Sequence, residues 1–67
     1  MPTTRFGMVL KRLRAAKGLS QQALADKAKV TDAYIAMLEM GTRKNPTIDT
    51  VKRLAKALKV PVAELLE

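Results

Sequence analysis

The stretch over residues 19–35 limits what this chain can fold into, because its pattern predicts two short helices joined by a tight corner. Ser20 and Thr31 are each placed to begin a helix, since a hydroxyl oxygen can accept a hydrogen bond from a free backbone N–H of the first turn. The expected helices cover residues 21–28 and 32–40, which leaves room only for a sharp turn between them. A helix–turn–helix unit of this kind can place its second helix in the major groove of DNA.

The rest of the chain also has helical signals. Three further helices are expected over about residues 4–17, 47–58 and 61–66. Gly18 and Gly41 are suited to the left-handed position after a helix, and Thr47 is suited to begin one. In the last helix, Val62, Leu65 and Leu66 are expected to close the core. The prediction is therefore one all-α domain of residues 1–67, a compact bundle of five short helices.

Composition narrows the class of protein further. The 67 residues include no cysteine, and 13 Lys and Arg against 6 Asp and Glu give a net charge of +7 with a pI near 10.3. So basic a balance is typical of nucleic-acid binding. The chain has no long apolar run, so we expect no signal peptide, no membrane segment and a cytoplasmic location. No residues are expected to remain for an effector domain.

The inventory of reactive side chains argues against catalysis. There is no histidine or cysteine, and Ser20 is the only serine. The three glycines lie far apart, and the six carboxylates are scattered rather than clustered. These are not the constellations that metal binding or acid–base chemistry needs. We expect no enzyme activity, no metal, no cofactor and no small-molecule ligand.

Several dispersed motifs point to one family. They are Leu13-Arg14, Lys17-Gly18-Leu19-Ser20-Gln21, Leu24-Ala25, Val30-Thr31, Tyr34-Ile35, Leu38-Glu39, Gly41, Asn45-Pro46-Thr47 and Ala55-Lys56-Ala57-Leu58. In this order they resemble the phage repressor/Cro-type (XRE-like) helix-turn-helix family. The resemblance implies a lambda repressor-like five-helix bundle, whose third helix reads the major groove and whose members usually bind two-fold DNA sites as homodimers.

The resemblance also implies roles for particular residues. The expected DNA contacts are Gln21, Thr31, Asp32, Ala33, Tyr34, Met37, Arg43 and Lys44. Arg14 and Glu39 match a structural ion pair between the first and third helices. Lys29 and Lys59 stand where members commonly carry glycine, and each would cost about 1 kcal/mol relative to glycine if its backbone is left-handed.

The outer face of the third helix is unusual for a base-reading surface. It carries no Arg, Lys, Asn or Gln, the side chains that usually form paired hydrogen bonds with purine edges. Asp32 could accept from a cytosine amine and Ala33 could touch a thymine methyl. Specificity would then depend largely on the loop and on DNA shape. Two alternatives therefore stay open: non-specific DNA binding, and an interaction module whose third helix binds a protein partner through its alanines and methionines.

One such module spans only a few base pairs, so we expect a homodimer on double-stranded DNA. The hypothesis for its interface is the C-terminal set Val60, Val62 and Leu66, together with Met8 and Val9, which are expected to be exposed. The sequence leaves open which regulator of this type it is: a phage-type repressor, a restriction–modification controller or an antitoxin.

Overall fold

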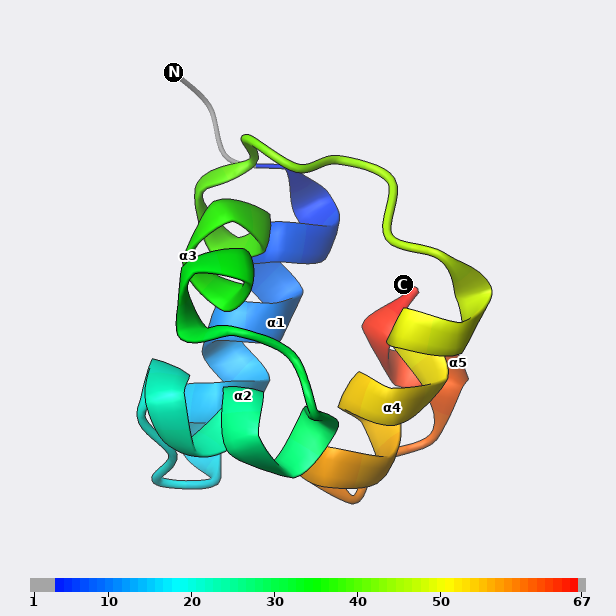
Figure 1. The fold of residues 1–67 in the computed structure, drawn as a ribbon. Helices are drawn as coiled ribbons and strands as arrows, with labels where there is room; N and C mark the ends of the chain where they lie inside the picture. The colour runs from blue at the N-terminus through cyan, green and yellow to red at the C-terminus, as the bar shows by residue number, and fades with distance from the viewer. Residues whose placement is uncertain (1–3, 67) are drawn as a thin grey trace.

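The computed structural model describes residues 4–66 and places five helices around one apolar core (Figure 1). The helices are α1 (Arg5–Ala16), α2 (Gln21–Ala28), α3 (Asp32–Met40), α4 (Ile48–Leu58) and α5 (Val62–Leu65). The predicted all-helical, five-helix class is confirmed. Within the described residues, no helix has both the length and the apolar character needed to cross a lipid bilayer.

The first four helices all begin with a hydroxyl cap. Each cap oxygen accepts a hydrogen bond from the backbone N–H three residues further on, at 3.0–3.2 Å. The caps are Thr4, Ser20, Thr31 and Thr47. Because the first N–H groups of a helix have no partner within it, these caps fix where each helix starts. Local sequence therefore determines the starts of α1–α4.

Four residues at or just after helix ends have a positive φ angle. Gly18 (φ 70°) and Gly41 (φ 83°) follow α1 and α3, while Lys29 (φ 60°) and Lys59 (φ 59°) follow α2 and α4. Glycine adopts this left-handed backbone without a steric penalty, but a lysine does not. The strain expected at the two lysine turns is therefore present in the fold.

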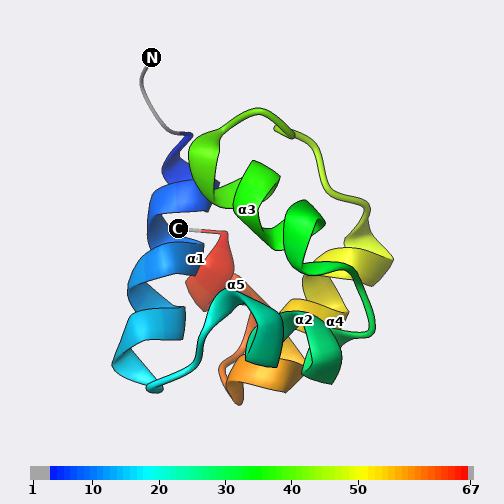
Figure 2. The same cartoon turned by 60° about the vertical axis from the view of Figure 1, so that its left-hand side comes forward.

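The core is formed by aliphatic side chains from all five helices. Its fully buried members include Leu10, Leu24, Ile35, Leu38, Leu54, Leu58 and Leu65. Helix α3 packs against both α1 and α2, as Figure 2 shows from another side. Ala25, at 1% exposure, lies on α2, which contacts both α3 and α4. A small residue at this position suits helices that pack closely.

Two expectations about exposure are wrong. Val9 was expected on the surface, but only 7% of it is exposed. Helix α1 contacts α3 and also α5, so it buries a wider face than a single stripe. Leu66 was expected to help close the core, but it lies just after α5 with 56% of its surface exposed. Leu65, which was expected there as well, is fully buried and closes the core at this end.

Candidate nucleic-acid interface

The start of α3 is held by two side-chain hydrogen bonds. The Thr31 Oγ1 atom accepts from the Tyr34 backbone N–H at 3.1 Å. The Asp32 Oδ1 atom accepts from the Ala33 backbone N–H at 2.8 Å. A carboxylate at this end of a helix is favourable, because the free N–H groups give the N-terminus a partial positive charge. Asp32 therefore uses part of its hydrogen-bonding capacity to stabilise its own helix.

The candidate contact residues of α3 lie outside the core. Ile35, Leu38 and Glu39 form the buried side of the helix. Thr31, Asp32 and Ala33 are exposed, and Tyr34 and Met37 are half-buried. The exposed start of α3 thus presents one hydroxyl, one carboxylate and one methyl group. This is a surface of small side chains that a double helix could approach closely.

The loop between α3 and α4 folds back onto α3. The backbone N–H groups of Thr42 and Arg43 both donate to the Met37 carbonyl oxygen, at 3.0 and 3.2 Å. The Arg43 guanidinium carbon lies 5.2 Å from the centre of the Tyr34 ring. An arginine above an aromatic face is attracted by the negative charge of that face. Arg43 is therefore directed back across α3, while Lys44 beside it is exposed.

A polar network joins α1, α2 and α3. The Arg14 Nε and Nη2 atoms donate to the two carboxylate oxygens of Glu39, at 2.6 and 3.1 Å. The Arg14 Nη1 atom donates to the Leu19 carbonyl oxygen at 2.8 Å. The Gln21 Nε2 atom donates to Glu39 Oε1 at 3.0 Å. The structure thus brings the expected ion-pair residues together and adds Gln21 to them.

The ion pair within this network is nearly closed to water. The Glu39 side chain is 4% exposed and the Arg14 side chain 14%. The hydrogen bond to Glu39 raises the pKa of Arg14, and this effect and the charge of Glu39 outweigh burial, which lowers it. Among residues 4–66, no buried side-chain polar atom lacks a hydrogen-bond partner. Since an amide carries two N–H donors, Gln21 keeps one donor for a ligand.

This network borders a hollow of about 420 Å³ on the surface. Met8, Lys11 and Met40 complete its rim. Gln21 is half-buried there as the first residue of α2, where backbone N–H groups favour an anion such as phosphate. The glutamine is thus held at a helix N-terminus by an acid on a neighbouring helix.

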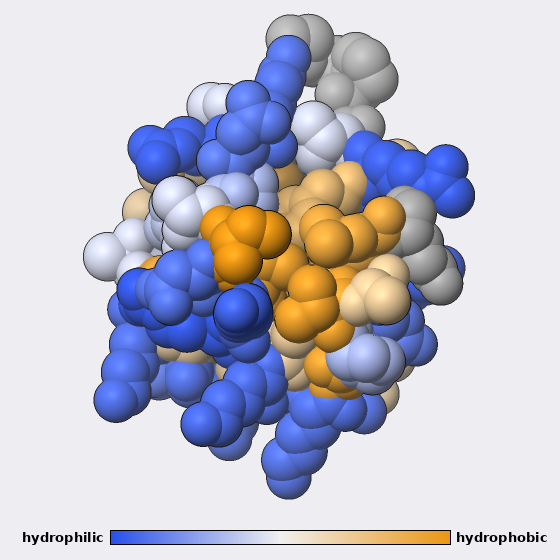
Figure 3. Space-filling view, turned by 90° about the vertical axis from the view of Figure 1, so that its right-hand side faces the viewer, coloured by the Kyte–Doolittle hydropathy of each residue, from blue (hydrophilic) through white to orange (hydrophobic). Residues whose placement is uncertain are grey.

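A second surface of interest is formed by α4 and α5. Apolar side chains gather on the side of the molecule that these helices occupy (Figure 3). Ile48 and Leu66 are 61% and 56% exposed, while Val60 and Val62 are half-buried against the core. The dimer interface predicted from the sequence did not include Ile48. The position of this residue directly after the cap of α4, one turn before the buried stripe of that helix begins at Val51, was the available signal.

Comparison with known proteins identifies the fold. The model of a family described as Helix-turn-helix matches residues 10–65 of this chain. An uncharacterised regulator of this type from Bacillus subtilis, RghRB, is 39% identical over 61 residues, covering 91% of this chain and 44% of RghRB. The curated relatives named in this class are transcriptional regulators, in agreement with the expectation of a non-enzymatic protein. This chain spans about half the length of several of them.

Solved structures agree with this assignment. The restriction–modification controller protein C.AhdI from Aeromonas hydrophila superimposes with a TM-score of 0.86 at 40% identity, over 90% of this chain and 89% of that protein. The biofilm regulator SinR in complex with DNA gives a TM-score of 0.89 at 34% identity, over 92% of this chain and 98% of the SinR chain. Both resemblances extend over nearly all of the helices described above.

Proposed function

This chain belongs to the helix-turn-helix family, and on that premise we propose that it binds double-stranded DNA at specific sequences and regulates transcription. The observation that carries the proposal is the α2–α3 unit, in which Ser20 and Thr31 cap two short helices joined by residues 29–31. The similarity to SinR, whose structure was determined in complex with DNA, supports it. Helix α3 would enter the major groove.

In this proposal, α3 reads the groove mainly through shape. Ala33 is exposed in the first turn and can meet a thymine methyl group. The Thr31 hydroxyl and the Asp32 carboxylate are partly used by the helix itself, so neither is a strong base reader. Sequence preference would then rest on the fit of small side chains and on the ease with which a given DNA sequence deforms.

Phosphate contacts would supply most of the affinity. Gln21 offers its remaining amide N–H beside the free backbone N–H groups at the start of α2. Arg43 and Lys44 add positive charge from the α3–α4 loop. The net charge of +7 would draw the protein toward DNA and make binding weaken as salt rises.

The proposal includes a homodimer formed through α4 and α5. Exposed Ile48 begins α4, exposed Leu66 follows α5, and Val62 on α5 is half-buried. Apolar side chains gathered on one face are the kind of surface that a second copy can cover. A DNA target in a cell of the bacterial kind in which the relatives occur supports a cytoplasmic location as part of the proposal.

The binding face can be tested by titrating duplex DNA into isotope-labelled protein and following backbone amide signals. We expect the largest shifts at the start of α2, in the first turn of α3 and at residues 43–44. Lys52, an exposed cation on α4, serves as the reference position. Shifts centred on α4 and α5 would contradict the proposed face. An absence of shifts would favour the alternative of a protein partner for α3.

A further inference from the structure

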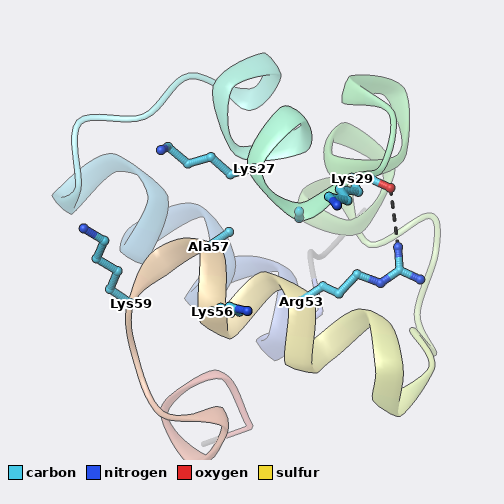
Figure 4. A pocket seen from close by; sticks show the side chains of 7 residues that line it. Lys27, Lys29, Arg53, Lys56, Ala57 and Lys59 are labelled. Atoms are coloured by element: carbon cyan, nitrogen blue, oxygen red, sulfur yellow. Dashed lines mark hydrogen bonds between the residues drawn. The ribbon is translucent and has the colours of Figure 1, made fainter.

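The surface between the end of α2 and the second half of α4 is hollowed and strongly basic (Figure 4). Its volume is about 440 Å³, and its charged lining is Lys27, Lys29, Arg53, Lys56 and Lys59. The rest of the lining is alanine, and no carboxylate borders the hollow. None of these residues belongs to the proposed DNA-binding face.

Two of the lysines are held in a costly backbone conformation. Lys29 and Lys59 are the only non-glycine residues with positive φ in the part of the chain that the structure describes. The other two positive-φ positions, Gly18 and Gly41, carry the residue that avoids the cost. Both strained lysines border the same hollow. Strained positions of this kind cluster at functional sites.

A purely structural role explains only two of the four lysines around the hollow. Lys27 and Lys56 lie in the last turns of α2 and α4, where a cation offsets the partial negative charge of the helix end. Lys29 and Lys59 come after those helices, where glycine would give the more stable turn. A glycine at either position would lack the ammonium group. The positive charge is therefore what these lysines add at the expense of a less stable turn.

The charge of Arg53 is balanced by a neighbouring acid, whereas the charges of the four lysines around the hollow are not. Arg53 is paired with Asp49 through bonds of 3.0 and 2.6 Å, and its Nη1 atom donates to the Lys29 carbonyl oxygen at 3.4 Å (Figure 4). Arg53 thereby links α4 to the turn after α2. Within residues 4–66, none of the four lysines has an ion-pair partner. Lys27 and Lys59 reach out on the same side of the hollow.

We propose that this hollow binds a polyphosphate anion, meaning a small molecule with two or more linked phosphoryl groups. Lysine ammonium groups bind phosphate as point charges, and four of them suit several negative charges on one ligand. The volume lies within the range of about 300–1,000 Å³ that is typical of small-molecule pockets. A neighbouring hollow of about 200 Å³ shares Lys27 and Lys59 and adds Lys17, so the basic surface continues toward the end of α1.

Inorganic triphosphate is the probe for this site. It is titrated at constant ionic strength into the isotope-labelled chain, and the backbone amide signals are followed. The proposal predicts saturable shifts at residues 27–29 and 53–59, with little change at Gln21 or Tyr34. Absence of saturation, or shifts centred on α3, would overturn it. A random-sequence duplex is titrated in parallel, and shifts at these residues with the duplex but not with triphosphate would also overturn it.

The lysine turns allow a variant that removes charge without harming the fold. The double variant Lys29→Gly/Lys59→Gly replaces both strained residues with the one that the backbone favours. We expect its triphosphate affinity to fall roughly threefold to tenfold, since each lost ion pair is exposed and weak, while its melting temperature does not fall. The control, Lys11→Gln/Lys52→Gln, loses the same charge outside the hollow. An equal loss of affinity in both variants would mean that triphosphate binding depends only on the net charge of the protein. That result would overturn the proposed site.

Discussion

Arg14 on α1 and Glu39 on α3 form a two-point ion pair, and the same carboxylate also holds the Gln21 side chain at the start of α2. One buried acid thus fixes three of the five helices relative to one another. It also sets the orientation of the glutamine proposed to meet a phosphate. Folding and ligand contact are therefore coupled through Glu39, so a change in the pair should affect both.

We expect Arg14→Met to destabilise the protein by about 3 kcal/mol, because it leaves the buried Glu39 carboxylate without its cation. Urea unfolding followed by circular dichroism measures this change. The control is Arg53→Met, which breaks the exposed pair with Asp49 and should cost no more than about 1 kcal/mol. Similar losses of unfolding free energy in the two variants would show that burial does not strengthen the contribution of the Arg14 pair to stability.

We expect Lys29→Gly and Lys59→Gly each to stabilise the protein by about 1 kcal/mol, because the left-handed backbone strain disappears. Thermal unfolding of each single variant measures the gain. The converse control is Gly18→Ala, which should destabilise by a similar amount. The added Cβ there meets nothing within 4 Å, so only the backbone conformation (φ 70°) opposes it. A loss of stability in both lysine variants would contradict this account of the turns.

Lys44→Ala should weaken DNA binding almost equally for all sequences and lower the slope of log affinity against log salt by about 1, because one phosphate contact is lost. Fluorescence anisotropy over a series of salt concentrations gives both quantities. Lys52→Ala removes the same charge from an exposed position on α4 and should change the slope less. Equal slopes for the two variants would show that Lys44 does not contact a DNA phosphate.

Ile48→Asp and Leu66→Asp should each shift the protein from dimer to monomer, because a carboxylate would be buried in the proposed interface. Both side chains are more than half exposed, so neither change should unfold the monomer. Val62 is a less suitable position for this test, because it also packs against the core and its substitution could unfold the monomer. Sedimentation velocity measures the mass, with Met40→Asp on α3 as the control. A dimer that survives both substitutions would exclude this face.

The helices could be predicted because their signals are local. Hydroxyl residues at positions 20, 31 and 47 mark starts, and Gly18 and Gly41 mark ends, within a few residues of the chain they control. The burial of Val9 could not be read in this way. It depends on how elements distant in sequence, α3 and α5, pack against α1.

The site was predictable only in part, for the same reason. The contact between Arg43 and Tyr34 depends on the path of an irregular loop, for which no periodic pattern exists. The bond from Gln21 to Glu39 requires α2 and α3 to pack correctly first. No pattern in the sequence links the lysines of α2 to those of α4, and only the packing of the two helices brings them around one hollow.

Whether α3 selects DNA by sequence can be measured by selection from a random double-stranded DNA pool at physiological salt. We expect the recovered DNA to carry a two-fold symmetric motif, with half-sites about one helical turn apart. Bound DNA without any enriched motif would contradict sequence-specific recognition by α3. Failure to retain any DNA would contradict DNA binding itself.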